Sequence, residues 1–250
     1  MSKSSTVSII LPNYNSSEYI TETIDSIINQ TFKNWQLIIV DDHSDAKTKS
    51  ILKNYNKNKK IKIYFLNKNK GAAYCRNFAL KKTKSSYVAF IDSDDIWEKN
   101  KLDMQIKTMK KRKYGFTYTN YKTFKDGETD FKYVSVPSSF DYKKFIKNTS
   151  IATSSMVVKK ELLKNIEFTN TKICEDYFFK CQILKKTKAY LINDFLIYYR
   201  IRKNSLQSNP FKNFFWIWKI NKNFNKLNIL ENIFSLVFIS LNSFLKYGLK

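Results

Sequence analysis

The chain has 250 residues, of which 43% are hydrophobic, so it can form one large domain or two small ones with a substantial core. Lys and Arg outnumber Asp and Glu by 45 to 21, and the formal charge of +24 favours anionic partners such as nucleotides, nucleic acid or acidic lipid. The composition excludes a disordered chain, and a single histidine argues against a zinc site.

Cysteine usage and the N-terminus indicate the compartment. Cys75, Cys174 and Cys181 cannot all pair with one another within the chain, which suits a reducing cytosol. The first twelve residues pass directly from polar residues into a strand-like run, without the apolar core of a signal peptide. We therefore expect a cytoplasmic protein.

The first hundred residues alternate between apolar runs and stretches with helical spacing. Strand-like runs rich in β-branched residues lie at 7–11, 37–40, 61–66 and 87–91. Isoleucines at helical intervals fill 20–28, and a weaker helical pattern lies at 51–55. Continuous apolar strands separated by amphipathic helices predict an α/β fold whose parallel sheet is covered on both faces.

Polar side chains follow three of these four strands. They are Pro12, Asn13, Tyr14 and Asn15 after the first, Asp41, Asp42, His43, Ser44 and Asp45 after the second, and Asp92, Ser93, Asp94 and Asp95 after the fourth. In parallel sheets ligands bind beyond the carboxyl ends of the strands. A single Asp there can be a helix cap, but clustered carboxylates in a basic chain favour a divalent ion with a phosphate-bearing partner.

Three segments occur in the order VSIILPNYNSSEYITETIDSIINQTFKNWQLIIVDDHSD, NKGAAYCRNFAL and YVAFIDSDDIW. Together they resemble the nucleotide-sugar half of a family 2 inverting glycosyltransferase with the GT-A fold. The likeness is close over 6–100 and looser to about residue 208. It implies a Rossmann-like, mainly parallel central sheet flanked by helices, in a catalytic domain at 1–208. Residues 1–100 would form the nucleotide-sugar-binding half and 101–208 the acceptor-side half.

The resemblance also implies roles for residues around the donor. The residues that match the uridine-holding loop are Pro12, Tyr14 and Asn15, with Glu18 within reach. Asp42 matches the acceptor of a hydrogen bond from the ring N–H of the base, which favours a UDP or dTDP donor, and Asp41 is expected to support the loop. Arg76 matches a basic position that pairs with the donor phosphates; a solvated helix face is its alternative.

Asp92, Ser93 and Asp94 match the Asp-x-Asp motif of the family. The resemblance implies that Asp92 binds ribose or sugar hydroxyls and that Asp94 reaches a Mn²⁺ or Mg²⁺ ion on the diphosphate. Asp95 is a second candidate for the metal. Such an ion neutralises the charge that a nucleoside diphosphate gains as it leaves.

The segment ICEDYFFKCQIL matches the Glu-Asp motif that provides the catalytic base of this family. An inverting transfer needs a base that takes the proton of the acceptor hydroxyl. The resemblance implies Asp176 as this base, with Glu175 as the alternative. Carboxylates that stabilise a helix N-terminus are the other explanation of the pair.

The segment YYRIRKNSLQSN resembles the part of the family that closes over the diphosphate. Arg200 and Arg202 are able to hold phosphate through bidentate contacts. The sequence departs from the family here, since many relatives have histidine where Arg202 stands and a guanidinium cannot coordinate a metal. A solvated charged surface is the alternative for Arg200.

Residues 209–250 form a tail of different composition. Apolar residues recur there at helical spacing with Asn and Lys opposite them, which predicts amphipathic helices. The longest uncharged run, Asn232 to Leu245, is shorter than the roughly 18 residues of a membrane-spanning helix. We expect the tail either to lie on an anionic membrane surface or to pack on the catalytic domain or a second subunit of a homo-oligomer.

The sequence thus predicts a metal-dependent inverting hexosyltransferase that moves a sugar from a UDP-sugar to a hydroxyl of a cell-surface glycan. The acceptor is expected to be lipid-linked, of the lipopolysaccharide, O-antigen or capsule type, at the inner face of the plasma membrane. One alternative is a nucleotidyltransferase, but LPNYNSSEY lacks the Gly-rich phosphate loop such an enzyme needs. The other alternative is an RNA-binding protein. The acidic clusters lie where the binding groove of such a protein would need positive charge, so nucleic acid is not an expected partner.

Overall fold

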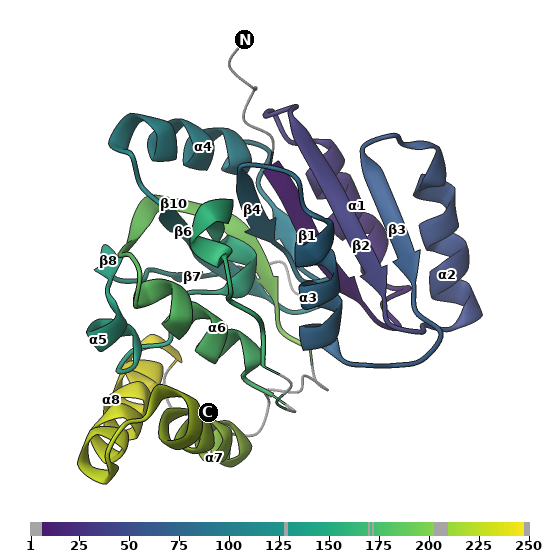
Figure 1. Cartoon of the computed structure of the whole chain (residues 1–250). Coiled ribbons are helices and arrows are strands. Elements are labelled where there is room, and N and C mark those ends of the chain that lie inside the picture. Colours follow the sequence, from purple (N-terminus) through teal and green to yellow (C-terminus); the bar gives the residue numbers. More distant parts are fainter. Residues whose placement is uncertain (1–6, 128–129, 170, 172, 203–209, 248–250) are drawn as a thin grey trace.

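The computed structural model describes residues 7–127, 130–169, 171, 173–202 and 210–247. These residues form a ten-stranded mixed sheet with helices packed around it (Figure 1). The strands are β1 (Val7–Asn13), β2 (Trp35–Asp41), β3 (Ile61–Phe65), β4 (Tyr87–Phe90), β5 (Ile96–Trp97), β6 (Phe116–Phe124), β7 (Lys132–Val134), β8 (Ser139–Phe140), β9 (Val157–Lys159) and β10 (Ala189–Arg200).

The α-helices alternate with these strands in the first half and gather at the end of the chain. They are α1 (Ile20–Ile28), α2 (Ala46–Lys53), α3 (Ala72–Lys82), α4 (Lys101–Arg112), α5 (Tyr142–Phe145), α6 (Glu175–Leu184), α7 (Pro210–Ile220) and α8 (Ile229–Tyr247). Short 3₁₀ turns lie at Asn54–Lys57, Thr153–Ser155 and Lys160–Leu163, and a π-helical turn at Asn221–Asn225 joins the last two helices.

The strand order is β3-β2-β1-β4-β9-β6-β10-β5, with β7 beside β6 and β8 beside β10. The four strands of the first half pair in parallel, as the sequence predicts. The second half is mixed because β9 pairs antiparallel with both β4 and β6, while β6 and β10 are parallel to each other. The carboxyl ends of β1, β2 and β4 therefore meet at one edge.

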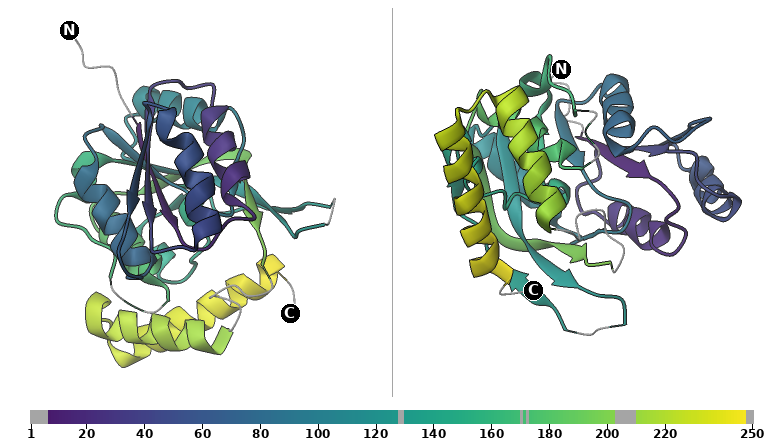
Figure 2. Two further views of the ribbon diagram at one scale, coloured as in Figure 1. Left: turned by 90° about the vertical axis from the view of Figure 1, so that its right-hand side faces the viewer. Right: turned by 90° about the horizontal axis from the view of Figure 1, so that it is seen from below.

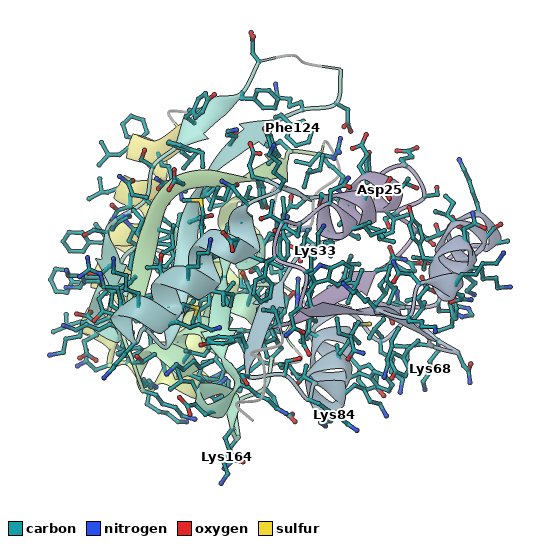
Figure 3. All side chains as sticks on the ribbon, turned by 90° about the horizontal axis from the view of Figure 1, so that it is seen from above. Asp25, Lys33, Lys68, Lys84, Phe124 and Lys164 are labelled. Carbon is teal, nitrogen blue, oxygen red and sulfur yellow. The ribbon has the colours of Figure 1, made fainter. Side chains whose placement is uncertain are left out.

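The core is continuous between the two halves of the domain. Ile20, Ile24 and Ile27 of α1 are fully buried, which explains their helical spacing. All residues of β1 and β4 are buried, as expected for strands covered on both faces. Exposed lysines lie outside this core, and Figure 3 shows Lys68 and Lys84 projecting from the rim of the molecule.

The helices α7 and α8 lie side by side at the lower end of the molecule, which is also the end toward which β1 runs (Figures 1 and 2). By length and composition alone α8 could cross a membrane, since the window Ile229–Lys246 has a mean hydropathy of 1.4 and 17% of it is buried. One such helix is weak evidence of a span. The helix is longer than the uncharged run in the sequence because Glu231 and Lys246 lie within it.

Candidate active site

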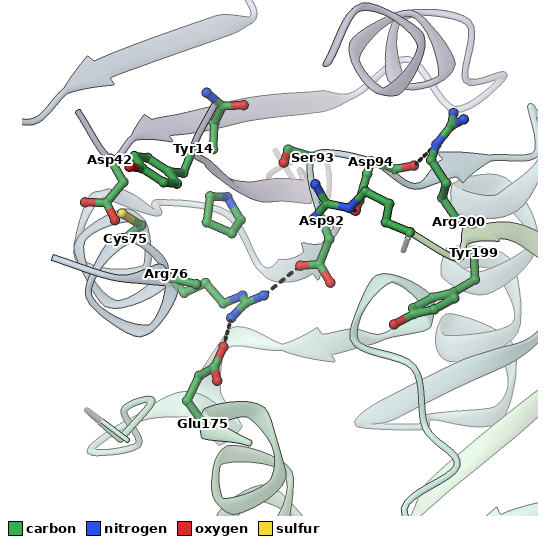
Figure 4. Close-up of a pocket in the computed structure, with 14 residues that line it drawn as sticks. Tyr14, Asp42, Cys75, Arg76, Asp92, Ser93, Asp94, Glu175, Tyr199 and Arg200 are labelled. Atoms are coloured by element: carbon green, nitrogen blue, oxygen red, sulfur yellow. Dashed lines mark hydrogen bonds and ion pairs between the residues drawn. The ribbon is translucent and has the colours of Figure 1, made fainter. Parts of the chain in front are cut away.

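A cavity of about 250 Å³ lies at the edge where β1, β2 and β4 end (Figure 4). Its lining residues are Pro12, Asn13, Tyr14, Asp42, Ala72, Cys75, Arg76, Asp92, Ser93, Asp94, Glu175, Tyr199, Arg200 and Arg202. The loops after three separate strands, the start of α6 and the end of β10 all contribute to it. Four predicted site residues lie outside this lining, namely Asn15, Glu18, Asp95 and Asp176.

Asp42 is held in place by the turn that opens α3. Its two carboxylate oxygens accept hydrogen bonds from the backbone N–H groups of Lys70 and Gly71, each at 2.7 Å. Gly71 has a φ of +86°, a conformation that favours glycine. A carboxylate has about four lone-pair sites, so Asp42 retains acceptor capacity toward the cavity.

The loop after β1 is held in place by hydrogen bonds. Asp41 accepts hydrogen bonds from the Asn13 side chain at 2.7 Å and from the Ser44 N–H at 3.1 Å, which agrees with its predicted supporting place. Asn15 is exposed, and its side-chain oxygen accepts from the Asp45 N–H at 2.9 Å. The loop leaves Tyr14 at the cavity with half of its surface exposed. Asn15 thus shapes the loop, whereas Tyr14 lines the cavity.

Arg76 connects two motifs that are 83 positions apart in the chain, from Asp92 to Glu175. The guanidinium is buried and donates to Asp92 at 2.6 Å and to Glu175 at 2.7 Å (Figure 4). Burial by itself lowers the pKa of Arg76. The two carboxylates raise this pKa by more, so Arg76 stays positively charged. The structure therefore places Arg76 as a bridge between the motifs, and the solvated-face alternative is wrong.

Asp94 and Asp95 differ in direction. Asp94 faces the cavity and accepts from Nε of Arg202 at 2.6 Å. Burial and the neighbouring Asp92 charge raise the pKa of Asp94 to about 6. Asp95 is buried away from the cavity, where it accepts from the Ser154 hydroxyl at 2.5 Å and the Arg200 N–H at 3.1 Å. The structure gives no support to Asp95 as a metal ligand.

Arg200 lies at the cavity wall as a buried anchor. Its guanidinium donates to the Asp94 carbonyl at 2.9 Å and to the carboxylates of Glu22 and Asp126. Its central carbon, Cζ, lies 4.8 Å from the centre of the Tyr19 ring and 4.5 Å from the centre of the Phe124 ring. The alternative of a solvated charged surface is wrong. The predicted phosphate clamp is not supported either, because these partners occupy the N–H donors of Arg200 that a phosphate would use. The predicted closing segment beyond Arg202 lies outside the described residues.

Asp176 lies in the first turn of α6, next to the cavity-lining Glu175. Its Oδ2 accepts from the Thr153 hydroxyl at 2.7 Å and from Nζ of Lys180 at 2.6 Å. Burial raises its pKa, but the Lys180 ammonium outweighs this and holds the pKa of Asp176 at about 2. The carboxylate is therefore ionised at neutral pH.

Some site residues were not predicted from the sequence. Tyr199 and Cys75 line the cavity, and Lys180 orients Asp176. Lys180 was detectable in principle, since it lies four positions after Asp176 in a predicted helix, where side chains meet. Cys75 gave no signal because its place at the cavity depends on how α3 packs.

The residues that face the cavity suit a divalent cation with a diphosphate. Asp92 and Asp94 offer hard carboxylate oxygens, and Mg²⁺ sites in proteins commonly use one or two carboxylates together with substrate phosphates. Among the described residues no group of three or more His, Cys, Asp and Glu side chains forms a cage for a metal. A site shared between protein and substrate is thus the arrangement that fits.

Residues 8–178 match Glycosyl transferase family 2. TuaG of Bacillus subtilis, named for teichuronic acid biosynthesis, is 36% identical over 228 residues, which cover 90% of each chain. WfgD of Escherichia coli, a UDP-Glc:α-D-GlcNAc-diphosphoundecaprenol β-1,3-glucosyltransferase, is 35% identical over 98% of this chain and 94% of its own.

Solved structures agree on the fold. Staphylococcus aureus TarS 1–349 in complex with UDP-GlcNAc matches with a TM-score of 0.74 and 24% identity, over 98% of this chain and 76% of TarS 1–349. The mannosyltransferase PcManGT from Pyrobaculum calidifontis, in complex with GDP-Man and Mn²⁺, matches with a TM-score of 0.70 and 16% identity, over the whole of this chain and 77% of that chain. On the family match and these full-length relatives, the chain belongs to glycosyltransferase family 2 and is a glycosyltransferase with the GT-A fold.

Proposed function

We propose that this glycosyltransferase moves a sugar from a UDP-sugar to a hydroxyl of a lipid-linked glycan, with inversion at the anomeric carbon. The observation that carries the proposal is that the Asp92 and Asp94 carboxylates share one cavity with Tyr14, Asp42 and Glu175. WfgD and WfaP, both named for transfer from UDP-Glc to a GlcNAc-diphosphoundecaprenol, support this class of donor and acceptor.

The donor base would bind between Tyr14 and Asp42. Asp42 retains acceptor capacity after its two backbone hydrogen bonds, and a pyrimidine with an N3–H can donate to it. The half-exposed ring of Tyr14 can cover the base. Uracil is therefore favoured over a purine.

Asp94, with Asp92 beside it, would hold Mn²⁺ or Mg²⁺ together with the donor diphosphate. When bound, the ion neutralises the negative charge that UDP gains as the bond to the sugar breaks. The guanidinium of Arg202 already lies against the Asp94 carboxylate, so Arg202 is positioned to contact the diphosphate as well. Arg76 forms ion pairs with Asp92 and Glu175 and so holds these two carboxylates in fixed positions.

We retain Asp176 as the base that takes the proton of the acceptor hydroxyl. Thr153 and Lys180 both bind its Oδ2, which leaves Oδ1 as the atom to accept the proton. Glu175 is engaged by Arg76 and faces the donor cavity, so it remains the alternative. The position of Asp176 outside the donor cavity suits contact with an acceptor.

A thermal-shift series with UDP, GDP and UDP-sugars, each with and without Mn²⁺, tests the donor assignment. A ligand that binds only the folded state raises the unfolding temperature, so UDP with Mn²⁺ should give the largest increase. A product assay should detect UDP release and no pyrophosphate. A larger shift with GDP, or an equal one without the metal, would contradict the proposal.

A further inference from the structure

The last two helices carry most of the exposed apolar surface of the described chain. Twelve of its seventeen exposed large hydrophobic residues lie in these helices and the turn between them, and they are Phe211, Phe215, Phe224, Ile229, Leu230, Ile233, Phe234, Val237, Phe238, Leu241, Phe244 and Leu245. We call the surface that they form the outer face. Soluble monomers rarely expose such a concentration of large apolar side chains, which marks an interaction site.

The inner side of α8 carries buried, hydrogen-bonded polar residues beside the buried Ile239, whereas its outer side is apolar. Asn221 of the connecting turn donates to Asn232 at 3.1 Å and to Ser235 at 2.9 Å. Ser235 donates in turn to the Ile146 carbonyl at 2.5 Å, and both Asn232 and Ser235 are buried. An amphipathic helix normally turns its apolar side to the protein and its polar side to water. Here large apolar side chains are on the outward side, which favours apolar surroundings there.

These polar contacts continue to the far end of α8. Asn242 donates to the Lys147 carbonyl at 3.1 Å and accepts from Asn148 at 3.1 Å. Lys246 donates to the Ser150 hydroxyl at 3.1 Å. A helix bound to the domain from Asn232 to Lys246 cannot leave it to cross a bilayer unless all these hydrogen bonds break. The contacts therefore favour a helix that lies flat.

The charge of the tail selects an anionic partner. Residues 209–250 contain six lysines and one glutamate, in a chain of net charge +24. Lys219, Lys222 and Lys226 are exposed beside the outer face, and the Lys219 ammonium lies 4.4 Å from the centre of the Phe215 ring. Lysines around an apolar surface bind acidic lipid headgroups while the apolar side chains enter the acyl boundary.

We propose that the outer face of α7 and α8 is a membrane-docking surface that lies in the plane of an anionic bilayer. This inference goes beyond the proposed function, because it does not depend on which donor or acceptor the active site binds. Figure 1 shows both helices at the end of the molecule where β1, β2 and β4 lead into the active site, so docking brings that site to the lipid surface.

The contact between the tail and the acceptor side supports this orientation. Lys246 donates to the Ser150 hydroxyl at 3.1 Å, and Lys180 donates to the carbonyl of the next residue, Ile151, at 2.8 Å. Lys180 is the residue that holds Asp176 at 2.6 Å. The last turn of α8 therefore lies close to the proposed base. If the acceptor is lipid-linked, as the proposed function states, its headgroup would reach Asp176 from the docked membrane.

Flotation of the full-length protein with vesicles tests the docking surface. The vesicles are pure phosphatidylcholine or an equal mixture of phosphatidylcholine and phosphatidylglycerol. The test variant changes three exposed residues of α8 (Phe234→Gln, Leu241→Gln, Leu245→Gln), and Tyr133→Gln on β7 changes a similarly exposed residue elsewhere. We expect the parent and Tyr133→Gln to float with the mixed vesicles, and the triple variant to bind at least about tenfold more weakly because it buries less apolar surface.

Two outcomes of the flotation would overturn the inference. They are equal flotation of the triple variant and the parent, and no flotation of the parent. A parent dimer by light scattering that the triple substitution dissociates would make a second copy of the chain the occupant. The thermal shift with UDP and Mn²⁺ should be unchanged in the triple variant. If that shift is missing in the parent while flotation is observed, only the proposed function fails.

Discussion

Asp94 interacts both with the positive charge of Arg202 and with the like charge of Asp92. Asp94→Ala should weaken Mn²⁺-dependent UDP binding by at least roughly tenfold, because even indirect partners of a metal ion contribute that much. Calorimetric titration of UDP with and without Mn²⁺ measures the change. Asp95→Asn is the control and should retain metal-dependent binding, because Asp95 is turned away from the cavity. The reverse pattern would exchange the two assignments.

The adjacent acids of α6 should separate binding from chemistry. Asp176→Asn should keep UDP binding and lower the rate of transfer by roughly 100-fold or more, the usual contribution of a general base. Glu175→Gln should instead weaken donor binding, because it breaks the ion pair that fixes Arg76. Titration of UDP and a UDP-release assay with acceptor distinguish the two variants. Transfer at the parental rate by Asp176→Asn would make Glu175 the base.

Lys180 should set the pH range over which Asp176 is ionised. The pKa of Asp176 is lowered from 3.8 to about 2, so the stabilisation from its ion pair is complete above about pH 4 and is lost as the pH falls through 2. Lys180→Met should raise this pKa and move the acid limb of the transfer rate to higher pH. It should also reduce stability at neutral pH by roughly 3 kcal/mol, since a mostly buried carboxylate loses its partner. Lys180→Arg keeps the cation and should leave the acid limb in place; an unmoved limb in Lys180→Met would contradict the role.

At the scale of elements, the turn before α3 links backbone geometry to donor recognition. Gly71 has a φ of +86° and its N–H binds Asp42, while a methyl group at this position would meet no atom within 4 Å. Gly71→Ala should therefore act through backbone strain, with a loss of about 2 kcal/mol in unfolding free energy and weaker UDP binding. Gly127→Ala is matched to it, with a φ of +78° and equally open space, but lies away from the cavity. If both variants weaken UDP binding equally, Asp42 is not positioned by this turn.

At the scale of the whole molecule, the tail and the catalytic domain share one core. Ile217, Ile220 and Ile239 are buried in the same cluster as the sheet, and the Tyr177 hydroxyl of α6 donates to Asn221 at 2.8 Å. The predicted boundary between 208 and 209 marks a change in composition while the packing continues across it. A chain that ends at residue 208 should lose several kcal/mol, as each large side chain that it exposes costs about 2 kcal/mol. An unfolding temperature equal to that of the full chain would make the tail an independent unit.

The sequence predicts those parts of the molecule whose structure is set by local apolar pattern and by strand direction. Apolar runs in the first hundred residues predict β1 to β4, and their parallel pairing brings Asp42, Asp92 and Asp94 to one cavity. The pattern failed for Arg200, whose buried position depends on Glu22, Tyr19 and Phe124 from distant segments. It also left open which side of α8 faces the domain, since that side is set by the partners of the helix.

The sequence by itself determined the family and the parallel half of the sheet, and it named the candidate residues for binding a nucleotide sugar, because these follow from periodicity and from motifs within short segments. Only the tertiary structure decided which carboxylates face the cavity, that Arg76 joins Asp92 to Glu175, and that α8 turns its apolar side outward. The reason is physical: a side chain's direction and the pKa of its ionisable group depend on neighbours brought together by packing, and a single sequence does not state which segments become neighbours.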